Sequence, residues 1–184
     1  MLTTCWLDLD GGTKLLKMSD QEAAERFGAV AEQFCRSVEA SPRMQREQFL
    51  LGMHRLLPLL IHEAASLPDV PVDYTSDEKP KIRMTSEDWQ SLYYSLQEML
   101  GDWNQYRQVF DPINDSEVVI GTLSDDFGDI YRDLKEGLGI IRTDSTKTAD
   151  AIWEWRFSFL SHWGKHALDA LQAIHSRIYD LTLR

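Results

Sequence analysis

The stretch LSDDFGDIYRDLKEGL, residues 123–138, decides the fold class of this chain. At about 100° per residue, its large apolar side chains gather on one side of a helix. These are Phe127, Ile130, Tyr131, Leu134 and Leu138. The carboxylates of Asp126, Asp129, Asp133 and Glu136 fall on the adjacent side. A pattern of this kind predicts an amphipathic helix that packs against other helices.

Helical spacing of apolar residues recurs in four other segments, which begin near Asp20, Arg43, Thr85 and Thr148. The last of them extends to about residue 179, with Gly164 as the place where it could break. Residues 67–86 hold three of the six prolines and predict a long irregular connection. We therefore expect an all-α, single-domain bundle of about five main helices over residues 19–184, preceded by an N-terminal arm at 1–18.

The sequence supports two further expectations about the region before the fourth helix. Residues 109–123 should connect two helices, and EVVIG (117–121) could form a short strand or an extended strip. Ser124 is expected to cap the fourth helix, which would place Asp125 and Asp126 in its first turn. Carboxylates are favoured there by the helix dipole, so these two acids have a structural explanation.

Net charge, apolar runs and cysteine spacing argue against several classes of protein. The 184 residues have a net charge of −11, which disfavours binding to nucleic acid and to anionic membranes. The longest apolar run, LLPLLI at 56–61, is too short to span a membrane. The N-terminus lacks a signal-peptide pattern, and the two cysteines are not spaced as a disulfide framework. We expect a cytoplasmic protein.

The last predicted helix carries the motif HxxxHxxD, formed by His162, His166 and Asp169 on one flank. Two imidazoles at this spacing can share one ion, and bundles often build metal sites from side chains on facing helices. The candidate metal ligands are therefore Asp129, Asp133, His162 and His166, with Asp126 as a further option. Neither Glu-x-x-His on two helices nor HExxH occurs, so the pattern is generic.

Two other interpretations of these residues compete with a metal site. The acids could form a solvated helix face, with His162 and His166 packed in the core. Alternatively, arginine and lysine side chains could pair with the acids and fix the register between the fourth and fifth helices. That interpretation ranks above the metal site, and its cations are Arg132, Lys135, Arg142, Arg156 and Lys165. The face under consideration thus comprises Asp126, Glu136, Arg132, Arg156, Trp163 and Asp169.

The chain contains no nucleotide-binding or nucleophile motif, since GxxxxGK[ST], GxGxxG and GxSxG are all absent. We therefore expect a non-enzymatic interaction or regulatory module with an acidic surface and no cofactor. A basic protein would suit that surface as a partner. The alternative is a metal-binding bundle or metal-dependent hydrolase that uses a divalent ion. The sequence does not fix the oligomeric state.

Several segments resemble an uncharacterised bacterial family, domain of unknown function 5063. They are FCRSVE (34–39), FLLGMHRLLPLLIHEAASLPDV (49–70), VFDP (109–112), LSDDFGDIYRDLKEGL (123–138) and WEWRFSFLSHWGKHALDAL (153–171). The resemblance covers about residues 20–175. It implies a small, mostly helical, cytosolic bacterial domain, and it brings no catalytic residues.

Overall fold

The computed structural model describes residues 19–71, 84–111, 113–114 and 116–182. Over these residues the predicted all-α bundle is confirmed, and one small sheet is added to it. The expected N-terminal arm at 1–18 and the greater part of the 67–86 connection lie outside the described residues. None of the described helices is long and apolar enough to cross a membrane.

Six α-helices make up the bundle. They are α1 (Asp20–Ala40), α2 (Arg46–Ala65), α3 (Ser86–Leu100), α4 (Leu123–Thr143), α5 (Thr148–Ser158) and α6 (Gly164–Thr182). Short 3₁₀ turns follow α1, α3 and α4: η1 (Ser41–Arg43), η2 (Gly101–Trp103) and η3 (Ser145–Lys147). A π-helical turn, η4 (Phe159–Trp163), joins α5 to α6.

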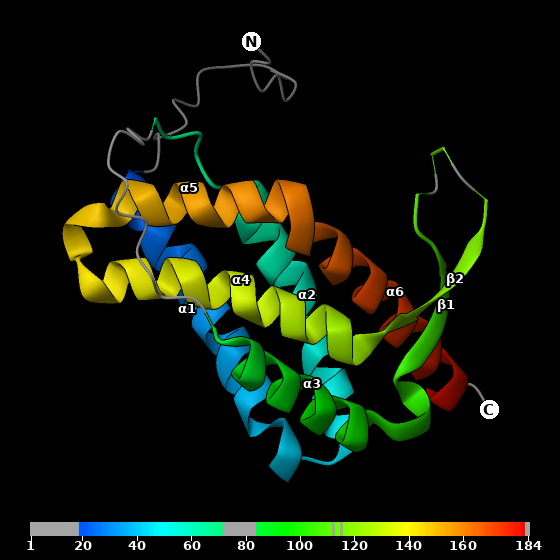
Figure 1. Ribbon diagram of the computed structural model, residues 1–184. Helices are drawn as coiled ribbons and strands as arrows, with labels where there is room; N and C mark the ends of the chain where they lie inside the picture. The colour runs from blue at the N-terminus through cyan, green and yellow to red at the C-terminus, as the bar shows by residue number, and fades with distance from the viewer. Residues whose placement is uncertain (1–18, 72–83, 112, 115, 183–184) are drawn as a thin grey trace.

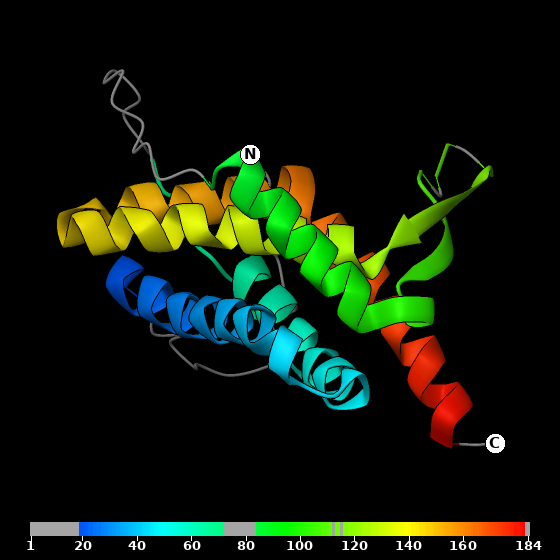
Figure 2. The same cartoon turned by 60° about the horizontal axis from the view of Figure 1, so that its bottom comes forward.

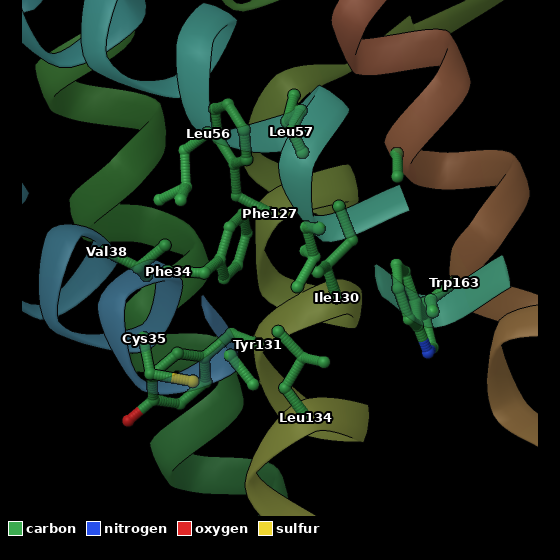
Figure 3. Close-up of a cluster of buried hydrophobic side chains, with 14 of the residues drawn as sticks. Phe34, Cys35, Val38, Leu56, Leu57, Phe127, Ile130, Tyr131, Leu134 and Trp163 are labelled. Atoms are coloured by element: carbon green, nitrogen blue, oxygen red, sulfur yellow. The ribbon is translucent and has the colours of Figure 1, made fainter. Parts of the chain in front are cut away.

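The opening stretch forms most of α4, and α4 is the central helix of the bundle. It contacts α1, α3, α5 and α6, so side chains are buried on most of its circumference. Figures 1 and 2 show α5 running alongside α4, with the pair α1 and α2 on another side and α3 crossing close by. Figure 3 shows α1 and α2 meeting α4 through a cluster that includes Phe34, Leu57 and Phe127. Each such fully buried side chain contributes roughly 1.5–3 kcal/mol.

Two glycines of α4 allow tryptophan rings to lie directly against its backbone. Gly128 faces the indole of Trp89 from α3, and a Cβ there would be 3.3 Å from the indole nitrogen. At Gly137 a Cβ would overlap the indole of Trp155, which donates its N–H to the carbonyl of Leu134 at 3.2 Å. Trp155 is fully buried, so Gly137 is required for α4 and α5 to approach this closely.

The predicted strand at EVVIG is confirmed, but its partner strand was not predicted. β1 (Gln105–Val109) pairs antiparallel with β2 (Val118–Thr122), with Gln105 opposite Thr122 and Val109 opposite Val118. Both views show this hairpin standing out from the helices beside α6 (Figures 1 and 2). The polar sequence QYRQV carries a weak strand signal because only one of its two faces is covered by protein.

One boundary prediction was wrong, whereas the break expected at Gly164 is confirmed. Thr122, rather than Ser124, caps α4, and its side chain accepts from the Asp125 backbone N–H. Ser124 is buried, and its backbone N–H donates to the side-chain oxygen of Asn104 at 2.9 Å. The last predicted helix is interrupted by η4, which ends immediately before Gly164. A Cβ at Gly164 would overlap the Phe159 carbonyl oxygen, so glycine permits this wide turn.

Substituting Gly137 tests the contact between α4 and α5. Gly137→Ala should destabilise the protein by about 1–3 kcal/mol, because the methyl group must displace the Trp155 indole. Gly52→Ala is the matched control, since a Cβ at this exposed α2 position meets no atom within 4 Å. It should stabilise the protein by about 0.5–1 kcal/mol. Urea unfolding measures both, and equal effects would contradict the packing described.

Candidate functional site

The acidic side of α4 faces the two histidines of the HxxxHxxD motif. His162 lies in η4 and His166 lies one turn later in α6, with ring centroids 5.0 Å apart. His162 Nδ1 is 2.7 Å from Asp133 Oδ2, and His166 Nδ1 is 2.8 Å from Asp126 Oδ1. The structure therefore brings all four candidate ligands together, with Asp126 added to them.

The other nitrogen of each histidine points at Asp129. His162 Nε2 and His166 Nε2 are 3.7 Å and 3.5 Å from Asp129 Oδ2. One ligand atom from each of these three residues lies within 4.8 Å of the others. Donor atoms bound to one tetrahedral ion at about 2.0–2.1 Å are separated by roughly 3.4 Å, so the two distances from the histidines to Asp129 are close to those of ligands that share a cation.

Burial excludes the solvated-face interpretation for the first two acids. Asp126 is 2% exposed and Asp129 is 8% exposed, whereas Asp133 is half-buried. Asp129 Oδ1 is buried without a hydrogen bond, although Arg132 Nη2 lies 2.9 Å away. Arg132 thus offsets part of the cost of burying this carboxylate through Oδ1, while both histidines face its other oxygen, Oδ2.

Asp126 is the most buried carboxylate of the cluster, and it has two hydrogen-bond donors. Tyr106 of β1 donates its hydroxyl to Asp126 Oδ2 at 2.6 Å, while His166 Nδ1 contacts the other oxygen. Burial raises the pKa of Asp126 and outweighs the opposing effect of these hydrogen bonds. The helix dipole alone does not explain this acid, contrary to the expectation from sequence.

The pKa of His166 is also shifted upward. Burial is the largest single influence and lowers this pKa, because it disfavours the charged ring. The hydrogen bond to Asp126 and the charges of Asp126, Asp129 and Asp125 together outweigh burial and raise it. His166 therefore keeps its ring proton to a higher pH than an ordinary imidazole does.

The arginine and lysine side chains that were expected to fix the register between the fourth and fifth helices pair mainly with other residues. Lys135 and Arg142 reach across to Glu39 and Glu32 of α1, at 3.0 Å and 3.1 Å. Arg132 stays within α4, where it lies against Asp129 and Asp133. The contacts described above between α4 and the segment η4–α6 are made by histidines.

The remaining residues of the predicted face separate into three environments. Trp163 is fully buried in the core against Phe159. Glu136 and Arg156 are half-buried on α4 and α5. Asp169 forms an ion pair with Lys165 on α6. None of these four is among the three residues whose ligand atoms converge.

Sequence reasoning missed Tyr106, which binds the cluster from a strand that was not predicted. Gly121 lies opposite Tyr106 across the hairpin, and a Cβ there would come within 2.8 Å of the Tyr106 ring. A glycine opposite an aromatic residue in paired strands is the signal that could have indicated a ring lying across the hairpin.

The fold and site together define an all-α bundle with a partly buried histidine–carboxylate cluster between its central helix and the segment η4–α6. The family model described as Domain of unknown function (DUF5063) matches residues 19–180, and the chain belongs to this family. The crystal structure of protein BF1032 from Bacteroides fragilis is similar, with 25% identity and a TM-score of 0.75. That match covers 89% of this chain and 96% of the other. No curated protein matches the chain.

Removing the Tyr106 hydroxyl tests its hydrogen bond to Asp126. Tyr106→Phe should destabilise the protein by about 1.5–3 kcal/mol, because a buried carboxylate loses a donor. Tyr94→Phe is the control, since Tyr94 is 63% exposed and its loss should change stability by less than about 0.5 kcal/mol. Denaturant unfolding at neutral pH compares them, and indistinguishable midpoints would count against this hydrogen bond.

Proposed function

We propose that this protein is a metal-binding helical bundle whose single site uses Asp129, His162 and His166. One observation carries the proposal: both Nε2 atoms face Asp129 Oδ2, while both Nδ1 atoms contact other carboxylates. Histidines that bind metals commonly donate their second ring nitrogen to a carboxylate, which fixes the tautomer and the ring orientation. Asp133 and Asp126 are placed to do this for His162 and His166.

The charge balance of the cluster also supports a cation. Four carboxylates and one guanidinium contribute charge to the site. They belong to Asp125, Asp126, Asp129 and Asp133, and to Arg132. Burial raises the pKa of Asp125 as well as that of Asp126, so the site holds its negative charge at a cost. A divalent ion would compensate this charge better than protons alone.

The donor set indicates which ions fit. Two imidazoles and one carboxylate suit Zn²⁺, Fe²⁺ or Mn²⁺, and three protein ligands leave at least one coordination position open. The His162 side chain is 38% exposed, so solvent has access to the site from its side. Such an ion, when bound, would supply a polarised water for hydrolysis, which is the hydrolase form of the proposal.

This proposal reverses the ranking that the sequence favoured, in which a non-enzymatic interaction module came first. The reason is geometric, because convergence of three ligand atoms depends on the π-helical turn and on burial of Asp129. An interaction surface remains compatible with a metal site, since Asp129, His162 and His166 do not line the apolar groove described below.

Elemental analysis and calorimetric titration of the full chain with Zn²⁺ and Mn²⁺ test the site. We expect one ion per chain, and Asp129→Ala and His162→Ala should each abolish binding. Asp133→Asn should weaken binding by about 10–100-fold, because it removes only the group that orients His162. Absence of stoichiometric metal, with no effect of added ion on thermal melting, would overturn the proposal.

Three further histidines serve as controls for that experiment. His62→Ala removes an exposed imidazole from α2 and should leave binding unchanged. His54 and His175 form a second imidazole pair, with ring nitrogens 3.1 Å apart. An ion bound at that pair would survive Asp129→Ala and be lost in His175→Ala, so the two locations are distinguished.

Metal binding should strengthen as pH rises. The folded-state pKa of His166 lies above its ordinary value near 6.5, so its proton competes with the ion up to and beyond that pH. The stability contributed by protonated His166 is present below pH 6.5 and is lost as pH rises through the raised pKa. The increase in melting temperature caused by Mn²⁺ should therefore be larger at pH 8 than at pH 6, and proton release should accompany binding. An ion effect independent of pH would contradict this role of His166.

A further inference from the structure

The hairpin and α6 enclose an open groove with an unusual concentration of exposed apolar side chains. Five of its apolar residues are between 55% and 68% exposed: Phe110, Val118, Ile120, Leu160 and Leu168. Its volume of about 1720 Å³ exceeds the roughly 300–1,000 Å³ of typical small-molecule pockets. Exposed apolar surface gathered in one hollow is characteristic of a site that binds another macromolecule.

We infer that this groove binds an extended, acidic segment of a partner protein, which adds to β1 as a third strand. The inference goes beyond the proposed metal site and does not depend on it. In this mode of recognition, backbone hydrogen bonds to a free strand edge supply affinity, and pockets for alternate side chains supply specificity. Three features of the groove support it.

The first feature is the outer edge of β1, which pairs with no strand besides β2 among the described residues. All five residues of β1 line the groove, whereas β2 contributes only Val118 and Ile120. The carbonyl of Gln105 accepts a hydrogen bond from Arg177 of α6 at 3.2 Å, so it points away from β2. Backbone groups alternate in direction along a strand, so the N–H and C=O of Arg107 and Val109 also point into the groove.

The second feature is the shape of the opposite wall. Leu160, Gly164 and Leu168 recur at intervals of four, which places them along one side of η4 and α6. Gly164 contributes no side chain between the two leucines. An extended segment would lie between this wall and β1, with alternate side chains on the same face of the sheet as Val118 and Ile120.

The third feature is local charge. Arg107, Lys165 and Arg177 line the groove with Asp111 and Asp169, a balance of three cations to two acids. The whole chain has a net charge of −11, so this groove is positive relative to the rest of the protein. An acidic partner segment is therefore favoured here, although the overall charge alone pointed to a basic partner.

Selection from a displayed library of random 12-residue peptides, on the full chain, tests the inference. Selected sequences should alternate apolar residues with Asp or Glu. The best peptide should lose at least tenfold in affinity when its alternate backbone amides are N-methylated, because the methyl groups block pairing with β1. Failure to select any peptide, selection of basic sequences, or affinity unchanged by N-methylation would overturn it.

Substitutions in the groove provide the second arm of the test. Ile120→Ser and Leu168→Ser should each weaken the selected peptide at least tenfold, and Arg107→Glu should weaken it by repelling its acids. Leu59→Ser is the matched control on α2, since Leu59 is 55% exposed, as Leu168 is. It should leave affinity unchanged. If the free chain dimerises and Ile120→Ser abolishes the dimer, the occupant is a second copy of the chain, and the inference is overturned.

Discussion

Burial of Asp126 and Asp129 on the central helix is the constraint on which the arrangement of the C-terminal half depends. A carboxylate removed from water must be hydrogen-bonded or paired, because its desolvation would otherwise destabilise the fold by several kcal/mol. His166 contacts both acids, His162 contacts Asp129, and Tyr106 reaches Asp126 from the hairpin. The side chains of one turn of α4 thus hold η4, α6 and the hairpin in position.

The position of those side chains depends on glycines that sequence periodicity treats as helix breakers. Gly164 allows the π-helical turn that carries His162, and Gly137 allows α5 to approach α4 through Trp155. Single π-helical turns inside longer helices occur frequently at functional sites, because an extra residue reorients the side chains around it. In this chain the turn coincides with one of the candidate ligands.

The fold class and the approximate helix positions could be predicted from sequence because they rest on local periodicity. A shared site of Asp129, His162 and His166 could be proposed because the acids repeat at helical spacing in one segment and the histidines do so in another. What could not be predicted depends on contacts between distant segments. The hairpin strand β1 has a polar sequence and exposes one face, and the hydrogen bond between Tyr106 and Asp126 exists only once the hairpin is placed. The burial of Asp126 was hidden by an adequate local explanation, the helix dipole.

A continuous set of contacts connects the candidate metal ligands to the strand edge of the groove. His166 contacts Asp126, and Asp126 accepts from Tyr106, whose neighbour Arg107 presents its backbone to the groove. Coupling between two sites is reciprocal, so an ion that strengthens the position of His166 would act on the hairpin as much as a bound segment would act on the ion. One hydrogen bond to a charged group limits this link to about 1.5–3 kcal/mol, or roughly 10–150-fold in affinity. The hairpin is therefore joined to the candidate metal ligands by one hydrogen bond, and a separate hydrogen bond between Arg177 and Gln105 holds it to α6.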